Sequence, residues 1–112
     1  MRIPVLLASL LATAANAAAG DALHRAQDRE IDGDARGAAI SFHQALQGLQ
    51  GLERAQAELL LAQSLARSGL PASASVYYLR VLDRGLGNPF YARALEGAVA
   101  VGPLDGPAAA AL

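Results

Sequence analysis

An internal repeat of 36 residues constrains the fold of this chain more than any other feature of its sequence. Five positions between residues 26 and 45 have counterparts of the same kind 36 residues later, small on small, glycine on glycine and ring on ring. Advancing by 36 again reaches Ala98 and Ala110. Such a period is typical of repeat architectures, so we expect two repeats and the start of a third. The paired positions are Ala26, Gly33, Ala38, Phe42 and Ala45, which fall on Ala62, Gly69, Ala74, Tyr78 and Val81.

The repeated unit is predicted to be two helices joined by a short turn. Apolar residues recur at helical spacing from Leu52 to Ala66. Gly69 then provides a C-terminal stop, and Pro71 suits the first turn of a following helix. We expect helices at 22–31, 35–49, 52–68 and 71–84, a fifth that Asn88 caps with Pro89 at its first position, and a short sixth after it.

Composition agrees with packed helices and excludes several functions. The chain is 54% hydrophobic and only 4% aromatic, so its core must consist mainly of Leu and Ala, which favour helices over strands. A net charge of −1 lacks the positive footprint that nucleic-acid binding requires. The absence of Cys excludes a disulfide framework, a thiolate metal site and a lipid anchor on cysteine.

Residues 1–19 have the pattern of a secretory signal peptide. Arg2 gives a positive start, residues 3–15 are uncharged and largely apolar, and Ala15-Asn16-Ala17 is a small-x-small cleavage site. Ala17-Ala18-Ala19 is a second possible site. The apolar run is shorter than the roughly 20 residues that a membrane-spanning helix needs. We therefore predict an exported protein, in the periplasm or alternatively secreted, with no stable membrane span after the leader is removed.

The hairpins resemble those of the tetratricopeptide-repeat family. That family has a small residue in the first helix, Gly at the turn, and small-x3-aromatic-x2-small in the second helix. Residues 54–84 fit this pattern best, and residues 21–50 fit it more loosely. The period here is 36 where the family has about 34, and the family's first-helix Trp is missing. Sel1-like helical repeats share similar patterns, and an ordinary four-helix bundle is the remaining alternative.

The resemblance implies an all-α fold of stacked helix-turn-helix hairpins, a right-handed α-solenoid of about two and a half repeats. The repeat domain would cover residues 20–112, with a first repeat at 20–50, a second at 51–87 and a partial third at 88–112. In the family, the first helix of each hairpin lines a groove that receives a peptide or a partner helix. On this chain that alignment gives Gln27, Glu30, Gln56, Gln63, Arg67, Arg93 and Glu96, which we term the predicted groove residues.

The function implied by the resemblance is protein binding or scaffolding, without catalysis, in a bacterial cell envelope. Amide and guanidinium groups suit it, because they bond peptide backbones and carboxylates. The alternative is an exported helical bundle with a structural or holdase-like role and no groove. The partner would be a protein or peptide and not a nucleic acid. Self-association is also possible, because Phe90, Leu95 and Val99 of the partial third repeat would have no following helix to cover them.

Catalytic and metal-binding patterns are weak. His24 and His43 fall on different predicted helices, where they are expected to face solvent. Three Asp residues around Gly33 resemble part of a calcium loop, but the position that needs Glu is occupied by His43. There is no G-x-S-x-G sequence and no glycine-rich phosphate loop. We therefore expect no catalytic residues, no metal and no cofactor.

Removal of the leader is the first testable prediction. Signal peptidase accepts the small side chains of Ala15-Asn16-Ala17, so N-terminal sequencing of the exported protein should begin at Ala18 or, from the second site, at Gly20. Recovery of Met1 on membrane-bound protein would contradict this prediction.

Overall fold

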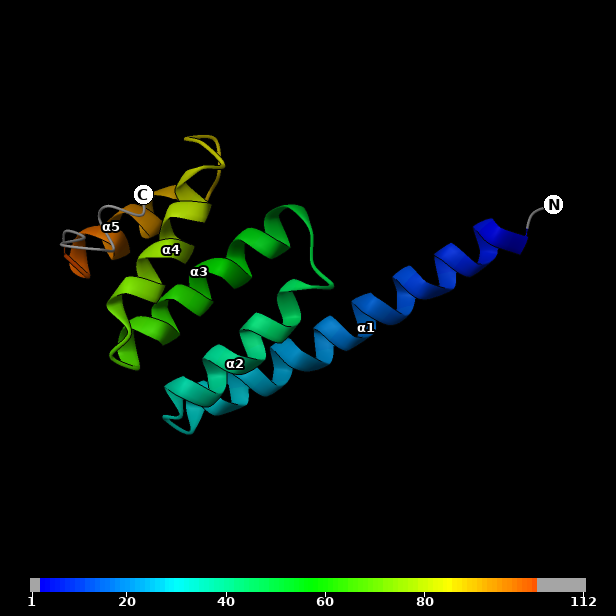
Figure 1. Ribbon diagram of the computed structural model, residues 1–112, viewed down its shortest axis with the longest axis horizontal. Coiled ribbons are helices and arrows are strands. Elements are labelled where there is room, and N and C mark those ends of the chain that lie inside the picture. The colour runs from blue at the N-terminus through cyan, green and yellow to red at the C-terminus, as the bar shows by residue number, and fades with distance from the viewer. Residues whose placement is uncertain (1–2, 103–112) are drawn as a thin grey trace.

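Five helices form the part of the chain that the computed structural model describes, which is residues 3–102, with side chains from Ala17 onward. Each helix packs against the next one in the sequence, and α3 also touches α5. Figure 1 shows that successive helices from α1 to α4 run in opposite directions, and that the N-terminal half of α1 extends beyond the end of α2. The expected all-helical fold is confirmed for these residues. The helices are α1 Ile3–Ile31, α2 Ala35–Leu46, α3 Gly51–Arg67, α4 Pro71–Leu82 and α5 Tyr91–Ala100.

The two hairpin turns have the same hydrogen bonds at the same spacing. Gly33 and Gly69 both have φ of 79°, a left-handed conformation that glycine adopts without strain. After α1, the Asp34 N–H donates to the Arg29 carbonyl at 2.8 Å, and after α3 the Leu70 N–H donates to the Leu65 carbonyl at 3.0 Å. Both bonds close the helix end in a Schellman motif. The predicted glycine stops are therefore confirmed at both turns.

Several expected helix boundaries are wrong. The first helix begins at Ile3 and not at 22, the second ends at Leu46 and not at 49, and the fourth ends at Leu82 and not at 84. The fifth begins at Tyr91 and not after a cap at Asn88. Instead of capping α5, the Asn88 side chain makes two other bonds. Its Nδ2 donates to the Val81 carbonyl at 3.0 Å, and its Oδ1 accepts from the Phe90 N–H at 3.0 Å. These bonds hold the turn against the end of α4, and α5 therefore begins three residues later, at Tyr91. The expected sixth helix lies outside the described residues.

Alanine fills the contacts between paired helices. Ala26, Ala38, Ala62 and Ala74 are completely buried, and the small side chain lets paired backbones approach closely. Tyr78 lies against α5, where a Cβ built on Gly97 would meet the ring at 2.3 Å. Buried residues form two clusters, one joining α1 and α2 to α3, and one joining α3 and α4 to Ala94 of α5. Leu52, expected in the buried stripe of α3, is 59% exposed at the start of that helix.

Among the described helices, none combines the length and the apolar character needed to cross a bilayer. α1 continues without a break through Gly20, where the predicted mature domain begins.

Overpacking the second hairpin should destabilise the protein. Ala62→Leu places extra methyl groups where Ala62 and Ala74 are both fully buried in one cluster, so the free energy of unfolding should fall by about 1–3 kcal/mol. The matched control is Ala72→Leu, since Ala72 is exposed on α4, and its effect should stay below about 0.5 kcal/mol. Coincident urea-unfolding curves for the two variants would show that the hairpin packing is wrong.

Candidate functional site

The predicted groove residues lie on α1, α3 and α5, the first helices of the expected hairpins. Five of them are exposed, while Glu30 and Gln63 are partly buried. Gln56, Gln63 and Arg67 share one side of α3, since they are separated by seven and four residues. Among the predicted groove residues, Glu30 and Arg67 form a direct ion pair.

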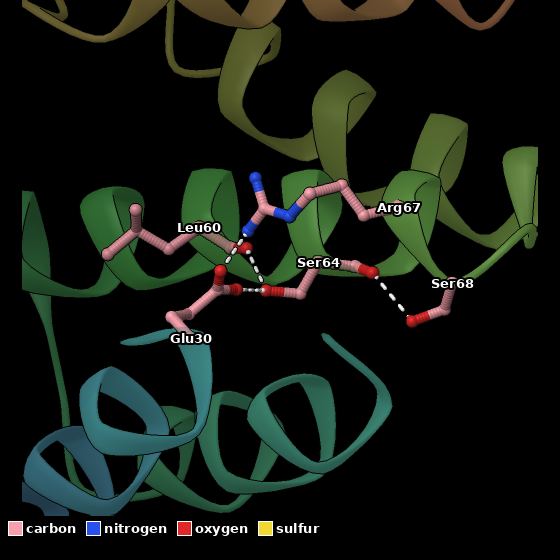
Figure 2. A network of polar contacts seen from close by, with 5 residues as sticks. All are labelled: Glu30, Leu60, Ser64, Arg67 and Ser68. Carbon is pink, nitrogen blue, oxygen red and sulfur yellow. Dashed lines mark hydrogen bonds and ion pairs between the residues drawn. The ribbon is translucent and has the colours of Figure 1, made fainter. Parts of the chain in front are cut away.

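Glu30 connects the end of α1 to α3 through two side chains. Figure 2 shows its carboxylate accepting from the Arg67 guanidinium on one oxygen and from the Ser64 hydroxyl on the other. The Ser64 hydroxyl also lies 3.0 Å from the Leu60 carbonyl, so its single proton serves two acceptors. These bonds span 34 and 37 residues of sequence and fix how the first hairpin meets the second.

This polar cluster is suited to holding helices together and not to nucleophilic chemistry. A serine hydroxyl bonded to a carboxylate can be activated for attack, but a nucleophile must be reachable by substrate. Ser64 has no exposed surface. Arg67 is half exposed, yet its charge is already paired with Glu30. A ligand carboxylate would reach Arg67 only by sharing or displacing that bond.

A second carboxylate, Glu58, is buried between α3 and the end of α4. Its side chain is 4% exposed and accepts from the Arg84 guanidinium at 2.6 Å, with Arg54 at 3.8 Å. Arg84 also donates to the Gly51 carbonyl at 3.3 Å. Sequence reasoning missed this cluster. The four-residue spacing of Arg54 and Glu58 signals an exposed helix pair, and only the fold brings in Arg84.

An apolar cleft of about 510 Å³ lies between α2 and α4, with α3 as its floor; we term it the α2–α4 cleft. Leu61 and Ala39 are buried there, whereas Ile40 is 57% exposed and Leu70 is 41% exposed. Helical spacing puts Leu61 and Leu65 on the opposite side of α3 from Gln56 and Gln63. None of the predicted groove residues lines it. The described lining is Arg36, Ala39, Ile40, His43, Gln44, Leu61, Leu65, Ser68, Leu70, Ser73 and Tyr77.

Arg36 is the charged residue of the described lining of the α2–α4 cleft, which also includes His43. Outside this lining, the Arg80 guanidinium lies 5.0 Å from the centre of the Tyr77 ring, within range of a cation–π contact. His43 and His24 are exposed, as the sequence predicted. Ile40 is the sequence signal that could have indicated this surface, because it is a large apolar residue that does not belong to the buried positions of the 36-residue repeat.

Two side chains have clearly shifted pKa values, and both shifts have structural causes. The Gly37 N–H and then the Arg29 guanidinium, both bonded to the Asp34 carboxylate, lower its pKa below the ordinary range. Burial raises the pKa of the Tyr78 phenol above its usual value. Neither residue lines the α2–α4 cleft. Within the described residues, no group of three or more His, Asp or Glu side chains is arranged to hold a metal ion.

No protein-family model, curated protein or solved structure matches this chain. The resemblance to tetratricopeptide repeats therefore depends on the chain's own residues and hairpin geometry.

Removing the partner of buried Glu58 should be costly. Arg84→Met leaves a carboxylate that is 4% exposed with Arg54 at 3.8 Å, so the free energy of unfolding should fall by about 1–3 kcal/mol in urea titrations. Arg29→Met, which breaks a pair whose side chains are 52% and 45% exposed, should cost much less. Adding Glu58→Gln to Arg84→Met should recover part of the loss. Equal losses in the two single variants would contradict a buried, paired Glu58.

Proposed function

We propose that this protein is a protein-binding module of the bacterial cell envelope, built as a short stack of tetratricopeptide-like hairpins. The observation that carries the proposal is the equivalence of the two hairpins. Positions 36 residues apart are buried alike, with Ala26, Ala38 and Ala45 matching Ala62, Ala74 and Val81 at no exposed surface. Together with the matching turns, this supports one repeated unit used twice.

The distribution of the core favours a stack over a closed bundle. In a repeat array each unit contacts its neighbours, whereas a bundle closes all helices on one core. Here α1 packs mainly against α2, and the buried residues divide into two clusters along the chain. α3 contributes to both clusters, as a helix shared by successive units would.

Protein binding through the predicted groove residues follows from this proposal. Gln56 and Gln63 present amide groups from one side of α3, where they can donate to and accept from a peptide backbone. Arg93 and Glu96 extend the same type of surface on α5. The Glu30–Arg67 ion pair holds α1 against α3, so we assign ligand contact mainly to the glutamines.

An apolar stripe on α5 that no other described residue covers supports self-association or a further helix from a partner. Leu95 is 46% exposed and Val99 is 72% exposed on α5, four residues apart on one side of the helix. An apolar stripe of this kind is the surface on which a following hairpin would pack.

Export is part of the proposal, and the packing of α1 favours one cleavage site. Ala19 is 3% exposed and belongs to the first core cluster, so cleavage after Ala17 keeps its contacts and cleavage after Ala19 removes them. We therefore favour Ala18 as the first residue of the mature protein.

Photo-crosslinking in the source bacterium tests the binding role. A benzophenone side chain at position 56 or 63 should give an adduct with the same protein at both positions, because both lie on one side of α3. The control is position 83, since Asp83 is exposed at the end of α4. Adducts of equal strength at position 83, or none at positions 56 and 63, would contradict the proposed groove.

A further inference from the structure

The two sets of helices differ in charge. In residues 17–102 the helical acidic side chains lie on α1, α3 and α5, whereas α2 and α4 contain no Asp or Glu. The charged or chargeable groups of α2 are Arg36 and His43, and α4 adds Arg80. Within their helical bounds α2 and α4 thus carry arginines and no carboxylate, while Asp34 caps the start of α2 and Asp83 the end of α4.

Arg36 lies within the described lining of the cleft, and Arg80 lies outside it beside Tyr77. α2 and α4 run in the same direction on either side of α3 (Figure 1). Arg36 is in the first turn of α2, whereas His43 and Arg80 are in the last turns of α2 and α4. Leu61 and Leu65 of α3 lie between these ends. The cleft thus has an apolar centre with Arg36 in its lining, and Arg80 borders it next to Tyr77.

Within the described residues, neither Arg36 nor Arg80 forms an ion pair with a carboxylate of the chain. Glu30 bonds Arg67, Glu58 bonds Arg84, and Asp34 bonds Arg29, all away from the described lining of the cleft. None of the described lining residues is acidic. Both arginines are therefore available to pair with carboxylates from another molecule, and opposite charge steers association and sets specificity.

We infer that the α2–α4 cleft binds an amphipathic segment of a partner protein, one with leucine-type side chains flanked by Asp or Glu. The inference rests on the proposed protein-binding function and names the chemistry of one partner. A volume of about 510 Å³ takes several apolar side chains and lies within the usual range of binding pockets. The apolar side chains cover Leu61, Leu65 and the exposed Ile40, and the carboxylates pair with Arg36 and Arg80.

The concave shape favours a peptide over an anionic membrane. A lipid surface meets flat or convex protein faces, whereas Leu61 is 2% exposed and lies at the bottom of the cleft. A narrow segment can enter between α2 and α4 and contact the floor. Each helix has 12 residues, so a partner helix of about 18 Å would run along the full cleft.

Fluorescence anisotropy with the purified protein tests the inference. The probe is a labelled 12-residue peptide in which pairs of Leu alternate with pairs of Glu, and its counterpart carries Lys in place of Glu. We expect the Leu/Glu peptide to bind with a Kd below about 100 μM and the Leu/Lys peptide to bind at least about tenfold more weakly. Combining Arg36→Glu with Arg80→Glu should reverse this preference, and Ile40→Ser should weaken both peptides.

Arg25→Glu is the matched control, because Arg25 is an exposed arginine on α1 that belongs neither to the predicted groove residues nor to the described lining of the cleft. Its affinity for the Leu/Glu peptide should equal that of the wild type. The inference is overturned if the Leu/Glu peptide does not bind, if both peptides bind equally, or if binding survives the Arg36→Glu and Arg80→Glu changes. Binding to phosphatidylglycerol vesicles in place of the peptide, or a dimer that Ile40→Ser dissociates, would also overturn it.

The outcome is separable from that of the proposed groove. Crosslinks at positions 56 and 63 without peptide binding would overturn the cleft and leave the protein-binding function standing. Peptide binding without those crosslinks would support the cleft and overturn the groove on the opposite side of α3. The absence of both would overturn both.

Discussion

Paired helices approach each other closely in this protein because alanine occupies their contact positions. Ala26 and Ala38 in the first hairpin, and Ala62 and Ala74 in the second, have no exposed surface. Each alanine gains little from burial itself, but it lets the larger side chains around it make dense contacts, where dispersion adds up over many atoms. Only 4% of the residues are aromatic, so the buried rings of Phe42 and Tyr78 are among the few large side chains that fill the space between successive helices.

Paired charges between helices help to fix how the helices of this small core align. Glu30 joins α1 to α3, and Glu58 joins α3 to the end of α4, each through an arginine. The buried Glu58 pair gains little net energy because its charges lose hydration, but a wrong packing that leaves Glu58 unpaired is costly. The two glutamates thus discriminate against other ways of stacking alanine-rich helices, which apolar contacts alone would distinguish poorly. Ser64 contributes to the same discrimination by filling the second oxygen of Glu30.

This arrangement of charge also separates two surfaces. The paired carboxylates lie on α1 and α3 or at the turn after α1, while α2 and α4 keep arginines outside those pairs. One side of α3 therefore presents Gln56 and Gln63, which suit a polar peptide backbone, and the other presents an apolar floor with Arg36 in the cleft lining. A short helical stack can offer both surfaces because α3 contacts helices before and after it. The proposed functions of the two surfaces can be tested independently.

The sequence by itself determined the helices and the buried small residues. Glycine stops and apolar spacing are local signals, so the turns at Gly33 and Gly69 could be predicted. The burial of the eight other paired positions of the 36-residue repeat could be predicted for the same reason. Asn88 was misjudged because its amide bonds the Val81 carbonyl, which lies seven residues earlier and competes with a cap. Only the tertiary structure joined Glu30 to Ser64 and Glu58 to Arg84, since side chains 34 and 26 residues apart meet only after the helices pack. The α2–α4 cleft likewise depends on the spacing between two helices, a quantity that no single helix specifies.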